Sequence, residues 1–114
     1  MWPEVHRAIS KQEAQVVLTA LQRAGTGIAN SEIETKIPSL VVLAYCPCGC
    51  GSVSFDVSRD RRYGLIADGY AVTDDGTNVG VIVWGDAETI SGLEIYRADE
   101  DDPKLPMPQS VRRS

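Results

Sequence analysis

All three cysteines of this 114-residue chain lie in one short segment, Cys46-Pro47-Cys48-Gly49-Cys50. In an extended segment alternate side chains point to the same side, so the three thiols would share one side. Thiolates are preferred zinc ligands, and the single histidine, His6, is a candidate for the fourth position. The residue types therefore admit two kinds of chemistry, a zinc site on Cys46, Cys48, Cys50 and His6, or a thiol-redox centre on the three cysteines.

The spacing within this segment favours a structural role over both chemistries. Alternate positions of an extended chain lie about 6.5 Å apart, whereas thiolates that share one zinc ion must approach to about 4 Å. Structural zinc sites also use two-residue spacers and two knuckles, which the segment lacks. Cysteine is small and commonly buried. We therefore expect no cofactor, with zinc as the alternative.

The remaining polar residues do not form a recognisable catalytic set. The sequence places no serine or cysteine as a partner of His6, and its nearest carboxylate in the sequence is Glu4. Aspartates beside glycines in expected turns are explained by hydrogen bonds to the backbone. These are Asp68, Asp74, Asp75 and Asp86. We predict no catalytic residue, and the sequence favours a protein that is not an enzyme.

Composition and charge limit the partners and the location. The net charge is -5 and the pI about 4.7, so the surface as a whole repels nucleic acid. The longest apolar run, residues 40–46, is far shorter than the roughly 20 residues that cross a bilayer. The N-terminus lacks the pattern of a secretion signal, and an odd number of clustered cysteines favours reduced thiols. We expect a cytoplasmic protein that binds neither nucleic acid nor membranes.

The N-terminal part of the chain has helical patterning. Ser10 and Glu13 have the spacing of a capping box, and the apolar residues after them predict an amphipathic helix of about 14 residues. Gly25 is expected to end that helix in the left-handed conformation. Residues 3–9 are compatible with a preceding helical turn. Residues 31–37 fit either a short helix or a strand, and Pro38 must end any helix there.

The rest of the chain reads as strands. Residues 40–45 suit a central strand buried on both faces, residues 52–58 alternate in polarity, and residues 65–72 form one or two further strands. Residues 79–84 and 90–97 are separated by a short loop, which indicates an antiparallel hairpin. The predicted fold class is α+β, with one or two N-terminal helices packed on a mainly antiparallel, four- or five-stranded meander. Residues 1–97 would form a single domain, and residues 98–114 an extended or disordered, acidic and Pro-rich tail.

Two short motifs together resemble those of a known group of sequences. Cys48-Gly49-Cys50-Gly51-Ser52 is followed some forty residues later by Leu93-Glu94-Ile95-Tyr96. The pair resembles a family of short uncharacterised bacterial proteins with an N-terminal helix, a C-G-C-x-S segment and a C-terminal Leu-Glu-(Val/Ile)-Tyr strand. The likeness covers roughly residues 10–97. It implies the order of the elements and a bacterial source, and it carries no activity.

Two aromatic residues are the candidate binding surface. Trp84 and Tyr96 fall on the two strands of the predicted hairpin, on the side opposite Val83 and Leu93, where they are expected to face each other. Such a pair usually belongs to a second core or is covered by a docked helix; if exposed, it marks a surface for a partner. The sequence thus favours a small, non-enzymatic module that binds a protein partner or a second copy of itself.

Overall fold

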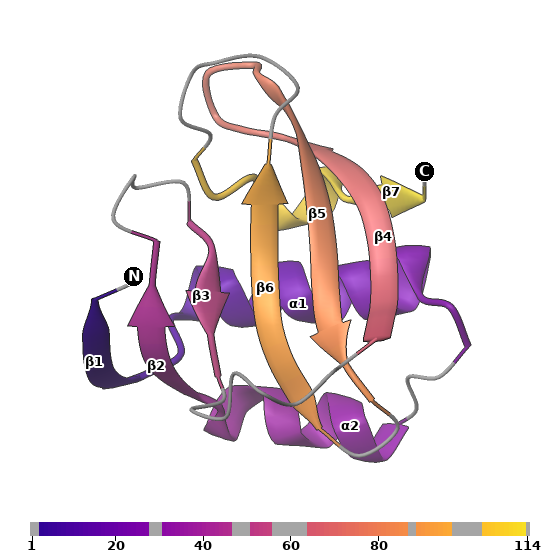
Figure 1. The fold of residues 1–114 in the computed structure, drawn as a ribbon. Coiled ribbons are helices and arrows are strands. Elements are labelled where there is room, and N and C mark those ends of the chain that lie inside the picture. The colour runs from indigo at the N-terminus through magenta and orange to yellow at the C-terminus, as the bar shows by residue number, and fades with distance from the viewer. Residues whose placement is uncertain are drawn as a thin grey trace.

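The helices lie on one face of an antiparallel sheet (Figure 1). The computed structural model describes residues 3–27, 31–46, 51–55, 64–86, 89–96 and 104–113. In these residues the elements follow the order β1 (Glu4–Ala8), α1 (Lys11–Ala24), α2 (Ser31–Lys36), the 3-10 turn η1 (Ile37–Ser39), β2 (Val41–Tyr45), β3 (Val53–Ser54), β4 (Gly64–Val72), β5 (Asn78–Gly85), β6 (Ile90–Tyr96), η2 (Pro108–Ser110) and β7 (Arg112–Arg113). The predicted α+β class is confirmed.

Helix α1 begins at the predicted capping box. The Ser10 hydroxyl accepts a hydrogen bond from the Glu13 backbone N–H at 3.0 Å, and the Glu13 carboxylate accepts one from the Ser10 N–H at 2.8 Å. Its end differs from the prediction, because Gly25 is extended (φ -70°) and the left-handed residue is Gly27 (φ 92°). A Cβ at Gly25 would lie 2.4 Å from the Leu21 carbonyl oxygen. Gly25 is therefore required by close packing and not by a positive φ.

Two local ambiguities of the sequence are resolved by the structure. Residues 31–36 form helix α2, and Pro38 lies within the turn η1 that follows it. The segment before α1 is not a helical turn but strand β1, which pairs with β2 through Glu4, Arg7 and Ala8. Pairing with β2 satisfies backbone groups that one isolated helical turn would leave open.

The sheet has more strands than predicted and a different order. Its order is β1-β2-β3-β6-β5-β4-β7, and every pair of neighbours is antiparallel. Only β4, β5 and β6 form a meander, and β6 then lies beside the short strand β3 instead of a sequence neighbour. Strand β2 lies between β1 and β3, but its residues are alternately buried and half-buried up to the exposed Tyr45, so it is not buried on both faces.

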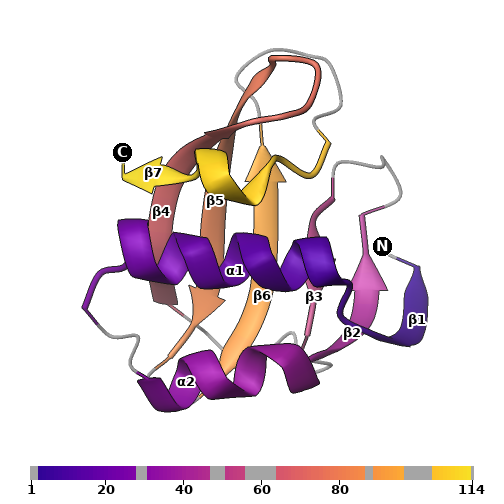
Figure 2. The same ribbon diagram turned by 180° about the vertical axis from the view of Figure 1, so that it is seen from behind.

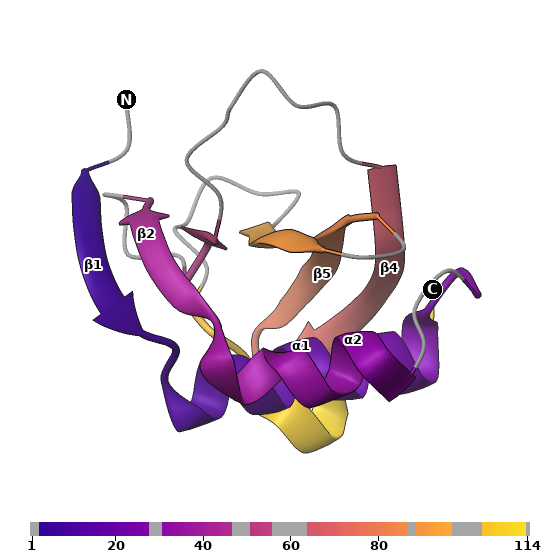
Figure 3. The ribbon, with the colours of Figure 1, turned by 90° about the horizontal axis from the view of Figure 1, so that it is seen from below.

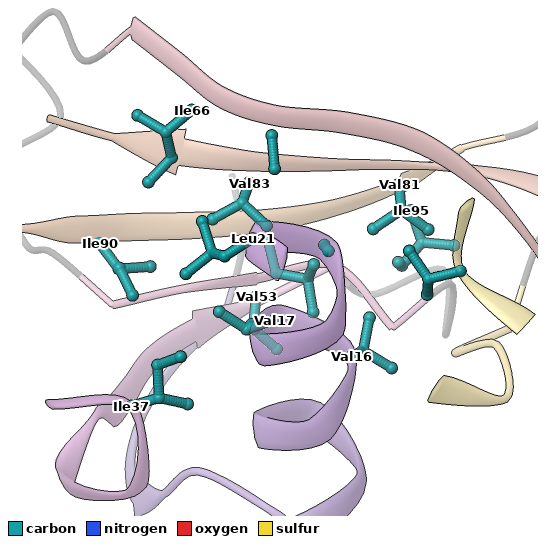
Figure 4. Close-up of a cluster of buried hydrophobic side chains, with 14 of the residues drawn as sticks. Val16, Val17, Leu21, Ile37, Val53, Ile66, Val81, Val83, Ile90 and Ile95 are labelled. Carbon is teal, nitrogen blue, oxygen red and sulfur yellow. The ribbon is translucent and has the colours of Figure 1, made fainter. Parts of the chain in front are cut away.

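The core fills the space between the sheet and the helices. Figures 2 and 3 show α1 and α2 side by side on the same face of the sheet, with α1 crossing the strands. Val16, Val17 and Leu21 of α1 meet Val81 and Val83 of β5 (Figure 4). Full burial of one such aliphatic side chain contributes about 1.5–3 kcal/mol relative to exposure. Among the described residues no helix is long and apolar enough to cross a membrane.

Residues 104–113, expected as part of an extended or disordered tail, instead pack against the domain. Val111 is fully buried in the core, and β7 pairs with β4 at Gly69 and Tyr70. The Met107 N–H donates to the Val72 carbonyl at 2.9 Å, and Arg23 of α1 donates to the Gln109 carbonyl at 2.8 Å. Apolar residues do not recur at regular spacing in this segment, so its sequence does not indicate that single residues such as Val111 anchor it to the domain. Residues 97–103 lie outside the described part of the chain.

Candidate binding face

Alternate residues of β4, β5 and β6 point away from the helices and form an outer face of the sheet. In β5 the buried valines Val79, Val81 and Val83 point inward, so the residues between them point outward. The register places the outward residues of the three strands in rows, and Figure 1 views the sheet from the face opposite the helices. We call them the outer-face grid, with the rows Tyr70–Gly80–Tyr96, Asp68–Ile82–Glu94 and Leu65–Trp84–Gly92.

Tyr96 lies flat across its neighbour on β5. A Cβ at Gly80 would sit 2.1 Å from Cζ and 2.4 and 2.6 Å from the two Cε atoms of Tyr96. Such nearly equal distances place the hydroxyl end of the ring directly above the Gly80 backbone. Gly80 is buried as a result, while Tyr96 keeps 40% of its surface exposed. The ring therefore has one face on the sheet and the other toward solvent.

Two carboxylates and a second tyrosine surround this ring. Tyr70 lies on the other side of Gly80 and is 49% exposed. Asp68 and Glu94 occupy the next row, separated by Ile82. Burial first, and then the negative charges near it from Asp68, Tyr70 and Glu94, raise the pKa of the Tyr96 hydroxyl. Burial and the neighbouring acidic groups therefore both disfavour the ionised form of Tyr96.

Trp84 shares the outer face with Tyr96 but does not face it. Its cross-strand neighbours are Leu65 and Gly92, whereas Tyr96 is opposite Gly80. Trp84 is four positions beyond Gly80 in β5, which is about 13 Å along a strand. Trp84 is half-buried. The expectation that the two aromatic residues face each other is wrong, because the register staggers them to opposite ends of the grid.

Sequence reasoning missed Tyr70, Asp68 and Glu94 as members of this face. The expectation that Asp68 lies in a turn beside Gly69 is wrong, because β4 runs unbroken from Gly64 to Val72. The i, i+2 spacing of Asp68 and Tyr70 was the available signal, since alternate residues of one strand share a face. Their juxtaposition with Glu94 depends on the register of three strands, which one strand's pattern does not give. Asp75 and Asp86 do cap turns as predicted, accepting from the N–H groups of Thr77 and Thr89.

The structure describes only part of the proposed thiolate site. Cys46 is half-buried and lines a cavity of about 320 Å³ together with Arg7, Glu13 and Tyr45. His6 is exposed on β1 and does not line that cavity. Cys48 and Cys50 lie outside the described residues. Within the described ranges no group of three or more His, Cys, Asp or Glu side chains is placed to hold a metal ion.

Ser52, the serine that closes the C-G-C-x-S motif, binds the strand that carries the second motif. Its hydroxyl accepts from the Ile95 N–H at 2.8 Å and donates to the Ile95 carbonyl at 3.2 Å. Both bonds are buried. The serine of the first motif and the strand of the second motif are therefore neighbours in space, and Ser52 has a structural role there.

An ion pair lies where β1 meets α1. The Arg7 guanidinium donates from Nη1 to Oε1 of Glu13 at 2.8 Å and from Nη2 to Oε2 at 2.9 Å. Burial by itself raises the pKa of Glu13, but the bonds from Arg7 and Ser10 together outweigh it, and the net pKa is below its ordinary 4.5. Both oxygens of this carboxylate are occupied, which indicates a structural role.

A further cavity of about 400 Å³ lies between α1, α2 and η1. Ile9, Ala14, Leu18, Ile37 and Pro38 provide its apolar lining. Its polar residues are Ser10, Lys11, Gln15 and Glu34. Ser10 is already engaged by the capping box.

Comparisons with known proteins do not indicate a function for this chain. No family model matches this chain, and neither a curated protein nor a solved structure matches it.

Proposed function

We propose that this chain is a small, non-enzymatic module that binds a protein on the outer-face grid. The observation that carries the proposal is the pair of exposed tyrosines, Tyr70 and Tyr96, on a sheet face that the described helices leave uncovered. Tyrosine offers a large, rigid contact surface with a polar tip, and it is enriched where proteins bind one another. The helices and the core occupy the opposite face, so substitutions in the outer-face grid leave the core residues in place.

The wider context of the proposal follows from composition. An acidic chain with a net charge of -5 is suited to a protein partner and not to nucleic acid. The clustered cysteines favour a reducing compartment, so we place the module in the cytoplasm. The bacterial source that we propose is the one that the family resemblance implies. The partner is either a different protein or a second copy of this chain.

A photo-crosslinker placed on the grid tests the proposal. Tyr70 is replaced by p-benzoylphenylalanine in the full chain, and adducts are collected after irradiation in cells. Tyr45 is the matched control position, because it is a tyrosine of similar exposure, 38%, on the distant strand β2. We expect an adduct from position 70 that disappears when Tyr96→Ser is added, and none from position 45.

The mass of the adduct distinguishes the two kinds of partner. An adduct of twice the chain mass identifies a second copy, and any other mass identifies a different protein. Equal adducts from positions 70 and 45, or an adduct that survives Tyr96→Ser, would contradict binding on this face.

A further inference from the structure

The cavity between α1, α2 and η1 has the size and the lining of a site for a small molecule. Its volume of about 400 Å³ lies within the roughly 300–1,000 Å³ of ligand pockets. Apolar side chains form its floor, and most of them keep part of their surface exposed. They are Ile37, which is buried, Ile9, Ala14 and Leu18, which are half-buried, and Pro38, which is exposed. A bound molecule would remove this apolar surface from water.

Two opposite charges line the cavity from different helices. Lys11 is the first residue of α1, and the half-buried Glu34 belongs to α2. Within the described part of the chain neither side chain has a hydrogen bond or an ion pair, to the other or to a third residue. The cavity thus presents one cationic and one anionic group that no described residue neutralises.

The polar groups on the α1 side favour an anion. Lys11 and Gln15 are one turn apart on α1, so they share a face of the helix. Lys11 also lies in the first turn, where the partial positive charge of the helix N-terminus adds to its own. The Gln15 amide can donate to a carboxylate oxygen. On the α2 side the carboxylate of Glu34 is an acceptor for a cationic donor.

From this arrangement we infer that the cavity binds a free α-amino acid with an aliphatic side chain of the leucine type. The ligand carboxylate would pair with Lys11, its ammonium group with Glu34, and its side chain would cover the apolar floor. A second copy of the chain fits the cavity less well, because two hollows brought face to face enclose a space without filling it. The cavity and the outer-face grid lie on opposite faces of the sheet, so the inference is independent of the proposed function.

Leucine and three analogues test the inference, because each analogue lacks one of the three groups. Isoamylamine is leucine without the carboxylate, isocaproate is leucine without the ammonium group, and glycine keeps both charges but has no side chain. Binding to the full chain is followed by amide chemical shifts, which also locate the site. We expect leucine to shift residues of α1, α2 and η1 and to bind about 3–10-fold more tightly than each analogue.

Two variants should respond to different analogues. Glu34→Gln should weaken leucine binding about 3–10-fold and leave isocaproate binding unchanged, because isocaproate has no ammonium group to lose its partner. Lys11→Gln should weaken leucine binding similarly and should not weaken the binding of isoamylamine. The matched control is Glu32→Gln, which removes the same charge from α2 at an exposed position that does not line the cavity.

Four results would overturn the inference. They are the absence of any shift with leucine at about 10 mM, shifts that map away from α1, α2 and η1, equal binding of leucine and its analogues, and an equal loss of affinity in Glu32→Gln. None of these results affects the crosslink at position 70, which tests the outer-face grid on its own.

Discussion

Ser52 and Ile95 are joined by two buried hydrogen bonds, one in which the serine hydroxyl accepts and one in which it donates. The pairing ties the chain entering β3 to the strand that carries Glu94 and Tyr96. The outer-face grid thus depends on a residue that is itself buried and does not belong to it.

Replacement of Ser52 by alanine tests this link. The substitution leaves the buried Ile95 N–H without its partner, so we expect a loss of about 1–3 kcal/mol in the free energy of unfolding, measured in urea. Thr35→Ala is the control, since its exposed hydroxyl bonds only the Glu32 carbonyl of its own helix. An equal, small effect of both substitutions would argue against a structural role for Ser52.

Gly80 and Tyr96 should be energetically coupled. A methyl group at Gly80 would overlap the Tyr96 ring, so Gly80→Ala should destabilise the protein by about 1–3 kcal/mol. The same substitution in a Tyr96→Ala background should cost much less, because the obstructing ring is gone. A double-mutant cycle by urea unfolding measures the difference. Additive effects would mean that the ring does not rest on Gly80 in solution.

The ionisation of Tyr96 should respond to the neighbouring carboxylates. Burial is the largest cause of its raised pKa, and the charge of Asp68 is the next. We expect Asp68→Asn to lower the pKa of Tyr96 toward its ordinary 10.0 without reaching it, as measured by NMR titration of the ring. Glu34→Gln on α2 should leave that titration in place, and a shift of the same size there would refute a local effect.

Glu13 should make the protein sensitive to acid. Because its pKa is lower in the folded chain than the ordinary 4.5, the stability it contributes is present above pH 4.5 and is lost as the pH falls through the folded-state value. Glu13→Gln keeps an acceptor for Ser10 but loses the charge, and we expect a cost of about 0.5–1.5 kcal/mol at neutral pH. The variant should also lose less stability than the parent between neutral pH and about pH 3. Glu32→Gln, on the exposed side of α2, serves as the control for general charge effects.

The cysteine segment gives a prediction that is independent of the binding face. From its one-residue spacers we expect protein purified without chelators to contain well under one zinc per chain. Elemental analysis of the purified protein measures the zinc content per chain. Zinc near one per chain in the parent, and its loss in Cys48→Ser, would replace the proposed function with a thiolate metal site.

Local patterns in the sequence were sufficient for several elements. The capping box at Ser10 and Glu13 placed the start of α1, and the short loop between residues 79–84 and 90–97 marked the hairpin of β5 and β6. These features depend on residues close together in the chain, whose preferences act without the rest of the fold. The α+β class followed from the same local signals.

Long-range contacts account for what the sequence did not reveal. Strand β1 exists because β2 supplies its hydrogen bonds, and Val111 is buried because β7 reaches the edge of β4. Trp84 and Tyr96 were correctly placed on one face, but their stagger and the approach of Asp68 come from the strand register. Such register is fixed by packing of the whole sheet.

The two residues of β3 have a consequence for how the sheet assembles. Strands β4, β5 and β6 join through short connections, whereas Val53 pairs with Leu93, forty positions later. Closing so long a loop costs more chain entropy than forming a hairpin. We therefore expect the hairpins of β4, β5 and β6 to form early and the pairing of β3 with β6 to form late. The two-residue strand β3 would then determine when the two halves become one sheet.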